Sequence, residues 1–170
     1  PWMLGICMRY FSDRMEAEDI VHESFIAICD KIGSLKDEKA LEAWMKRIVI
    51  NNCLMGIRKK VSTIAVEEVF DANITEPEAD ASETLKDKLL EAEFSTDVVL
   101  AIVQELPVGF RTVFNLYVFE GYNHQQIGAE LGISEGTSKS QLMRARKAIQ
   151  QRLAEWLTDE EKKKKKRNVL

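Results

Sequence analysis

Apolar residues recur every three or four positions along most of this 170-residue chain, and glycine, proline or small polar residues separate the periodic stretches. This spacing is typical of helices that turn one apolar face toward a core. The strongest example is residues 13–32, which Ser12 or Asp13 can cap and which end before Gly33. The residues that we expect to face the core on this helix are Val21, Phe25, Ile28 and Ile32.

Two more helices are predicted in the same part of the chain. Residues 2–11 have the pattern of the end of an apolar helix that stops near Ser12, so we expect that a preceding piece of the chain is missing. Residues 38–60 predict a third helix, and its basic last turn is one that the helix dipole favours. On this helix the residues expected to pack inward are Leu41, Met45, Ile48 and Met55.

The pattern breaks after residue 61, where acidic residues, alanines and the Glu76-Pro77 pair predict a flexible linker with a short helix from Ser82 onward. Helical patterns return at 97–106, which Ser95 or Thr96 can cap, and at 109–119. The sequence therefore predicts an all-α protein. Its expected parts are a helical domain at 1–61, an acidic linker at 62–94, a second helical domain at 95–157 and a frayed, charged tail at 158–170.

The stretch 123–156 predicts a helix-turn-helix. Asn123 can cap a short amphipathic helix, and Gly132 can close that helix in the left-handed conformation. Ser134 can cap a longer second helix, in which residues 136–154 include five basic residues and no acidic one. Such a basic second helix is the kind that lies in the major groove of DNA. The alternative is an ordinary amphipathic hairpin with a solvated basic face.

Composition narrows the class of protein. A chain that is 45% hydrophobic and 31% charged is ordinary for a soluble protein, and no apolar run is long enough to cross a membrane. No signal peptide is visible, so we expect a cytoplasmic protein. The formal charge of −4 is uneven: residues 65–97 carry two basic and eleven acidic groups, and residues 98–170 carry twelve basic and eight acidic groups. The acidic segment must therefore stay away from DNA phosphates.

Residues suited to catalysis or metal binding are few. Cys7, Cys29 and Cys53 are too scattered for a disulfide framework or a zinc site, and we expect all three to be buried apolar residues. The sequence has two histidines and carries neither a glycine-rich phosphate loop nor a nucleophile elbow. It therefore predicts no catalytic residue, no metal site and no cofactor.

Four segments in a fixed order carry a resemblance to one family. They are AEDIVHESF at 17–25, AWMKRIVINNCLMGIRKK at 43–60, LPVGFRTVFNLYVFEGYNHQQIGAELGI at 106–133 and SEGTSKSQLMRAR at 134–146. Together they resemble a sigma factor of bacterial RNA polymerase, of the compact extracytoplasmic-function (ECF) group. The resemblance implies a promoter-specificity subunit and not an enzyme. Its implied partners are core RNA polymerase, promoter DNA and an anti-sigma protein at the membrane, with no small-molecule substrate.

The resemblance also assigns residues to three surfaces. The first domain would dock on the coiled coil of the polymerase clamp through Glu18, Asp19, His22 and Glu23. It would also melt and capture the minus-10 element, with a base pocket in the loop at 33–39. The residues assigned to this element are Trp44, Arg47, Asn51, Arg58, Lys59 and Lys60. The second domain would read the minus-35 element as duplex DNA. Lys139, Ser140, Met143 and Arg144 would contact bases, and Thr137 and Gln141 would lie near phosphates.

Side-chain chemistry fits these roles, and simpler interpretations stay open. Trp44 and Asn51 lie two helical turns apart and share a face that could stack and hydrogen-bond an unpaired base, although either could be a core residue. The acidic row could equally be a solvated face. Lysine and arginine can donate to guanine acceptors, and Met143 can touch a thymine methyl group.

Three positions depart from the family pattern. His22 stands where glutamine is expected, Ser138 where valine is preferred, and Gln141 where arginine is frequent. The last two predict weaker packing and weaker phosphate affinity of the recognition helix. Two rival functions also remain at this stage. A helix-turn-helix regulator that acts without polymerase would explain residues 106–156 and not 17–60, and an adaptor would use the acidic linker as its binding surface.

Overall fold

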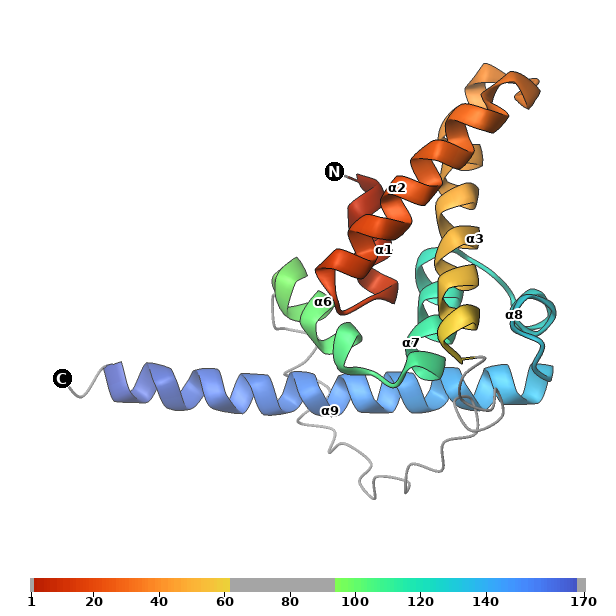
Figure 1. The fold of residues 1–170 in the computed structure, drawn as a ribbon. Coiled ribbons are helices and arrows are strands. Elements are labelled where there is room, and N and C mark those ends of the chain that lie inside the picture. The colour runs from red at the N-terminus through yellow and green to blue at the C-terminus, as the bar shows by residue number, and fades with distance from the viewer. Residues whose placement is uncertain (1, 62–93, 168–170) are drawn as a thin grey trace.

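The computed structural model describes residues 2–61 and 94–167. Within these ranges every regular element is helical, which confirms the all-α prediction (Figure 1). The N-terminal unit, residues 2–61, contains α1 (Trp2–Tyr10), α2 (Arg14–Lys31), η1 (Ile32–Ser34), η2 (Glu38–Ala40) and α3 (Leu41–Val61). The C-terminal unit, residues 94–167, contains α6 (Thr96–Glu105), α7 (Val108–Phe114), η3 (Asn115–Phe119), α8 (His124–Leu131) and α9 (Glu135–Arg167). The predicted linker and its short helix lie outside the described residues, except for Phe94.

Polar side chains begin the helices where the sequence predicts that they should. The Asp13 carboxylate accepts a hydrogen bond from the Met15 N–H at 2.7 Å, so Asp13 and not Ser12 caps α2. Ser95 caps α6 by accepting from the Val98 N–H at 3.4 Å. Because each cap satisfies an N–H that has no partner within its helix, these residues fix where the helices begin.

The faces of α2 and α3 that the N-terminal unit buries match the sequence prediction only in part: Ile28 is buried as predicted, but other predicted core residues are exposed. On α2 the buried residues are Ala17, Ile20, Ser24 and Ile28. Phe25 is 61% exposed and Ile32 is 45% exposed, so both were assigned wrongly to the core. The buried row contains a polar residue, Ser24, whose hydroxyl accepts a hydrogen bond from the Asn52 side chain at 3.0 Å, and this obscured the row in the sequence.

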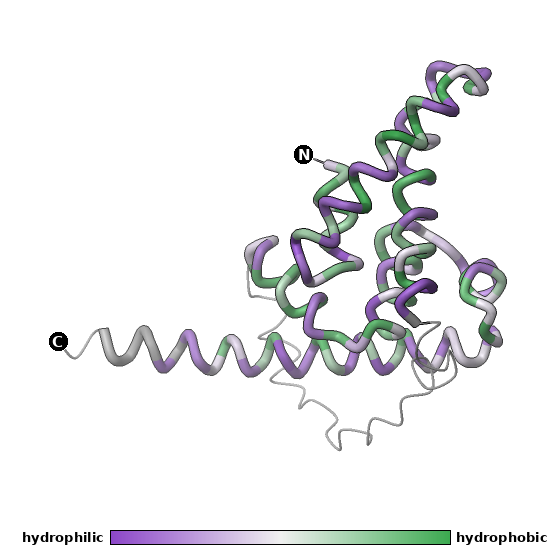
Figure 2. The backbone as a smooth tube through the Cα atoms, in the orientation of Figure 1, coloured by the Kyte–Doolittle hydropathy of each residue, from purple (hydrophilic) through white to green (hydrophobic). Residues whose placement is uncertain are grey.

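The same error of phase affects α3, where Met55 is 63% exposed. The buried residues of α3 are instead Val49, Ile50, Cys53, Leu54 and Ile57. Figure 1 accounts for the exposed apolar residues toward the end of α2, and not for Met55: α2 and α3 form a hairpin that projects well beyond α1, so no third helix covers its outer half. Apolar positions nevertheless continue along the hairpin toward its tip (Figure 2).

The C-terminal unit is assembled along α9, which begins beside α8 and runs under α7 and α6 (Figure 1). α9 has 33 residues and stays helical to Arg167, so residues 158–167 are not the frayed tail that the sequence predicts; residues 168–170 lie outside the described residues. Lysine and glutamate favour helix strongly, and the pair of Asp159 with Lys162 at 3.4 Å adds support on the exposed surface.

The two units share one apolar core. Tyr10, Phe11 and Ile57 of the N-terminal unit belong to the same buried cluster as Val113 and Ile127 of the C-terminal unit. The contact is made chiefly by α1, which packs against both α6 and α7. The sequence did not predict how the units would be arranged, because the contact joins residues that are about a hundred positions apart.

Candidate nucleic-acid interface

The helix-turn-helix has the local geometry that the sequence predicts. The side chains of Asn123 and Gln126 each accept a hydrogen bond from the other residue's backbone N–H, at 2.8 and 2.9 Å, and this capping box begins α8. Gly132 ends α8 at φ 70°. Ser134 accepts from the Thr137 N–H at 2.9 Å and begins α9. The three predicted cap residues are therefore confirmed.

A second glycine allows the turn to lie close against α8. A Cβ atom on Gly128 would stand 2.8 Å from the Ile133 carbonyl oxygen, which is closer than real Cβ atoms approach. The backbone N–H of Ile133 in turn donates a hydrogen bond to the Gly128 carbonyl oxygen at 3.1 Å. A side chain at 128 would therefore push the turn, and with it the start of α9, away from α8.

The two helices of the motif are also joined by a buried polar contact. Ser138 is fully buried, and its hydroxyl lies 3.0 Å from Nδ1 of His124. Tyr117 stacks on the imidazole at 4.8 Å between ring centres, and the Arg146 guanidinium lies over the Tyr117 ring at 5.6 Å. The serine that departs from the family pattern thus replaces apolar packing by a hydrogen bond.

The residues predicted for the minus-35 element lie on the first turns of α9, and most of them reach the surface. Lys139 and Met143 are exposed, and Thr137, Ser140 and Arg144 are partly exposed. The Lys139 ammonium pairs with Glu135 at 2.7 Å and lowers the pKa of that carboxyl group. Gln141 is the exception, because it is 1% exposed and faces the interior. A phosphate contact by the Gln141 side chain does not fit this position.

The residues predicted for the minus-10 element follow α3. Trp44 is partly buried, whereas Arg47 and Asn51 are exposed. Lys59 and Lys60 are exposed on the last turn, where Lys60 pairs with Glu16. The loop at 33–39, which includes parts of η1 and η2, is largely exposed at the tip of the α2–α3 hairpin.

The predicted polymerase-binding row lies on the outer face of α2. Asp19, His22 and Glu23 are exposed, and Glu18 pairs with Arg14 at 2.8 Å. The exposed apolar residues Phe25 and Ile26, each 61% exposed, directly follow this row. Sequence reasoning missed this apolar part of the surface because it placed Phe25 in the core.

Comparisons with known proteins identify the family. The profile described as Sigma-70 region 2 matches residues 1–63, and the profile described as Sigma-70, region 4 matches residues 96–149. The chain is 29% identical over 160 residues to the RNA polymerase sigma-H factor of Pseudomonas aeruginosa, covering 89% of this chain and 80% of that protein. This chain belongs to the ECF group of the sigma-70 family.

Other relatives agree with this assignment. The ECF RNA polymerase sigma-E factor of Escherichia coli is 25% identical over 137 residues, covering 79% of this chain and 72% of that protein. The fold is similar to the sigma factor RpoE of Bartonella quintana in its co-crystal structure with the anti-sigma factor NepR, with a TM-score of 0.53, 22% identity and 90% coverage of each chain. Sigma factors are DNA-binding initiation factors that give RNA polymerase its promoter specificity, and they are not enzymes.

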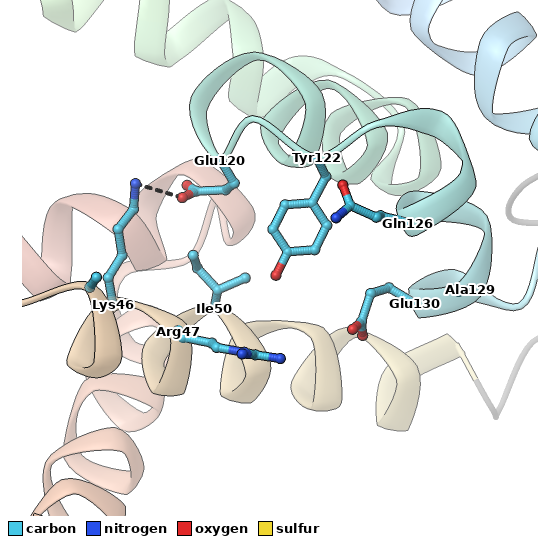
Figure 3. A pocket seen from close by; sticks show the side chains of 9 residues that line it. Lys46, Arg47, Ile50, Glu120, Tyr122, Gln126, Ala129 and Glu130 are labelled. Atoms are coloured by element: carbon cyan, nitrogen blue, oxygen red, sulfur yellow. Dashed lines mark ion pairs between the residues drawn. The ribbon is translucent and has the colours of Figure 1, made fainter. Parts of the chain in front are cut away.

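Region 2 and region 4 of this sigma factor meet at a buried carboxylate, Glu120, whose side chain is 1% exposed. The chain leaves α7 through the π-helical turn η3 and then Gly121 at φ 71°, and this exit presents Glu120 to α1 and α3. Glu120 pairs with Arg9 at 2.6 Å. It also pairs with Lys46 at 2.8 Å, as Figure 3 shows. Neither Glu120 nor Lys46 was singled out from the sequence, since their partners are remote along the chain.

The cysteines of this sigma factor differ from one another. Cys7 and Cys53 are fully buried, with their sulfur atoms 3.8 Å apart, whereas Cys29 is exposed and was predicted wrongly to be buried. The contact between the two buried thiols lowers the pKa of Cys7 and, together with burial, raises that of Cys53. Among the described residues no group of acidic, cysteine and histidine side chains could hold a metal ion, and no helix could span a membrane.

Proposed function

We propose that this sigma factor recognises its promoters at two elements and docks on polymerase through a third surface. The observation that supports the proposal is that the three predicted residue sets lie on three separate exposed faces, on α2, α3 and the start of α9. Only Gln141 departs from its set by being buried. Three separate surfaces suit a protein that holds polymerase and two stretches of DNA at once.

The α2 surface is suited to a basic protein partner. The carboxylates of Asp19 and Glu23 can pair with cations, and Phe25 and Ile26 supply apolar area beside them. Protein interfaces usually combine such an apolar centre with a charged rim. We therefore assign docking on the coiled coil of the polymerase clamp to this surface, with His22 as a hydrogen-bonding member.

The α3 surface is suited to single-stranded DNA. Trp44 offers a ring on which an unpaired base can stack, and Asn51 offers an amide to hydrogen-bond the edge of a base. Arg47, Arg58, Lys59 and Lys60 supply cations for the backbone phosphates. We assign capture of the melted minus-10 element to this face of α3, with the loop at 33–39 as the base pocket.

The start of α9 is suited to duplex DNA. Lys139 and Arg144 can donate to guanine acceptors in the major groove, and the exposed Met143 can contact a thymine methyl group. On the same turns, we assign Ser140 to the base-reading residues and Thr137 to a phosphate contact. We assign the minus-35 element to these residues.

A protein inhibitor is also part of the proposal. The similar fold from Bartonella quintana was crystallised with an anti-sigma factor. We infer that an anti-sigma protein sequesters this sigma factor as well, in the cytoplasm.

The decisive experiment reconstitutes the chain with bacterial core RNA polymerase and maps transcription start sites on genomic DNA. We expect starts downstream of a shared pair of sequence elements, and no such starts with core enzyme alone. Failure of the chain to bind core polymerase would overturn the proposal.

The rival function, a regulator that acts without polymerase, makes the opposite prediction. It requires the isolated chain to bind promoter duplexes tightly and specifically at physiological salt. We expect specific binding only in the presence of core polymerase, and a gel-shift or fluorescence-anisotropy titration with and without core enzyme distinguishes the two functions.

A further inference from the structure

Two of the three cysteines meet in the core of the N-terminal unit. Cys7 lies on α1 and Cys53 lies on α3, and no function proposed above uses either residue. Both side chains are fully buried, and their sulfur atoms are 3.8 Å apart. The sulfur atoms of a disulfide are about 2.05 Å apart, so these two atoms would have to approach by about 1.8 Å to form one.

The packing around the two thiols keeps them in contact. α1 packs directly against α3, and Tyr10, Ile20 and Leu54 belong to the same buried cluster as the two cysteines. A close-packed interior holds its side chains in place, so the two sulfur atoms stay together while the chain is reduced. An oxidant must therefore be small, and it reaches the pair when the core opens locally.

The two thiols differ in how readily they ionise. The Cys53 thiol donates a hydrogen bond to the Cys7 sulfur, and this contact lowers the pKa of Cys7, as does the charge of Arg9, although burial acts in the opposite direction. The same contact and burial raise the pKa of Cys53. Because the thiolate is the form that attacks an oxidant, Cys7 is suited to react first and Cys53 to react second.

We propose that Cys7 and Cys53 form a redox modification site, at which hydrogen peroxide joins α1 to α3 through a reversible disulfide that stabilises the N-terminal unit. In the first step the Cys7 sulfur attacks one peroxide oxygen and the O–O bond breaks, which gives a sulfenic acid and one water. In the second step the Cys53 sulfur attacks the Cys7 sulfur and the S–O bond breaks, which gives the disulfide and a second water. The two thiols lose two electrons and two protons, and the peroxide takes up both.

The disulfide would act on the stability of the chain and not on its proposed DNA face. Cys7 and Cys53 are 46 positions apart, and a cross-link over a loop of this length restricts the unfolded chain. Cys53 lies on the buried side of α3, whereas Asn51, two positions earlier, is exposed. The cross-link therefore forms behind the face of α3 that we assign to the minus-10 element. This inference does not depend on that assignment.

The test uses a Cys29→Ser chain, because the exposed Cys29 would react with peroxide itself and could link two chains. Only the buried pair then remains. After the folded chain is treated with hydrogen peroxide, we expect a thiol assay in denaturant to detect no free thiol. Peptide mapping by mass spectrometry should find Cys7 joined to Cys53 within one chain. Dithiothreitol should restore both thiols.

Thermal unfolding gives a second readout. The oxidised Cys29→Ser chain should unfold at a midpoint several degrees above that of the reduced chain, because the cross-link removes entropy from the unfolded state. The controls carry Cys7→Ala or Cys53→Ala in addition to Cys29→Ser. Peroxide should give neither of them an intrachain disulfide or a higher midpoint. Circular dichroism verifies that the controls are folded, and either one that folds is sufficient.

Three results would overturn the redox site. The first is that both thiols stay free in the folded chain at a peroxide concentration that oxidises them in the unfolded chain. The second is oxidation of the cysteines to sulfinic or sulfonic acids without a cross-link. The third is an oxidised chain whose unfolding midpoint is no higher than that of the reduced chain. Transcription by the reduced chain with core polymerase is scored separately, so its absence counts against the proposed function and not against the disulfide.

Discussion

The two DNA-binding surfaces proposed for this sigma factor differ in how they are partnered within the chain. At the start of α9, Lys139 pairs with a residue of its own helix, Glu135, and Met143 is open to solvent. On α3, Lys46 and Arg58 pair with carboxylates of the other unit. A local pair on an exposed helix costs little to break, whereas a pair at a packed junction breaks only when the junction opens. The proposed minus-35 surface is therefore paired only within its own helix, whereas the proposed minus-10 surface adjoins ion pairs that cross the junction between the two units.

The largest expected effect tests the proposed polymerase-docking surface on α2, on which promoter recognition by both DNA-binding surfaces depends. Asp19→Lys should abolish polymerase association, because a cation facing a basic partner costs several kcal/mol. Pull-down with core enzyme and start-site transcription measure the loss. Asp30→Lys, on the same helix and also exposed, is the control and should retain binding. Retained transcription in the Asp19→Lys chain would contradict the assignment of polymerase docking to α2.

The next effect separates the minus-35 surface from the minus-10 surface. Arg144→Ala should relax preference at one minus-35 base pair and lower transcription by about tenfold or more, since a good base contact is worth about 1–3 kcal/mol. Polymerase binding should be unchanged. Transcription from a promoter library with single substitutions locates the base pair. Arg152→Ala removes the same charge from the same helix further along, and an equal loss with that control would contradict base reading by Arg144.

Trp44→Ala should act at the other surface and at a later step. Loss of one stacked base costs about 1–3 kcal/mol, so promoter melting should fall while duplex binding by holoenzyme stays normal. Permanganate reactivity of unpaired thymines reports melting, and a gel shift reports duplex binding. Trp2→Ala, which removes a tryptophan exposed on α1, serves as the control. A parallel loss of duplex binding would show that the two surfaces do not act at separate steps.

The smallest expected effect concerns Ser138, the position in the helix-turn-helix where the family prefers valine. Ser138→Val restores the apolar residue that the family prefers but leaves His124 without its 3.0 Å partner. The gain in apolar burial and the lost hydrogen bond should nearly cancel, so we expect a change in unfolding free energy of about 1 kcal/mol or less. Denaturant unfolding measures it. A change of several kcal/mol would mean that the His124 contact organises the motif.

Local features of this chain could be predicted from its sequence. The caps Asn123, Gly132 and Ser134 depend only on residues within the same few turns, and all three occur as expected. The face of a helix that becomes buried depends on what packs against it. On α2 the prediction failed because α1 reaches only part of the hairpin and because Ser24 sits in the buried row.

The residue sets of the proposed binding surfaces could be predicted from the sequence, but the ion pairs that join the two units could not. The sequence motifs place the α2, α3 and α9 residue sets, but Gln141 faces inward and Cys29 faces outward. Successive residues of a helix are rotated by about 100°, so a shift of one position decides whether a side chain is buried. Glu120 had no signal in the sequence. Its partners, Arg9 and Lys46, lie 111 and 74 positions away, and only the packing of α1 against α6 and α7 brings them together.

The length of α9 has a mechanical consequence. A helix of 33 residues is a stiff rod of about 50 Å, and only part of it is held down by α7 and α6. Rotation of such a rod at its lysine-rich end would be transmitted to the turns that we assign to the minus-35 element. A protein that grips the distal half of α9 could therefore redirect promoter reading without approaching the DNA.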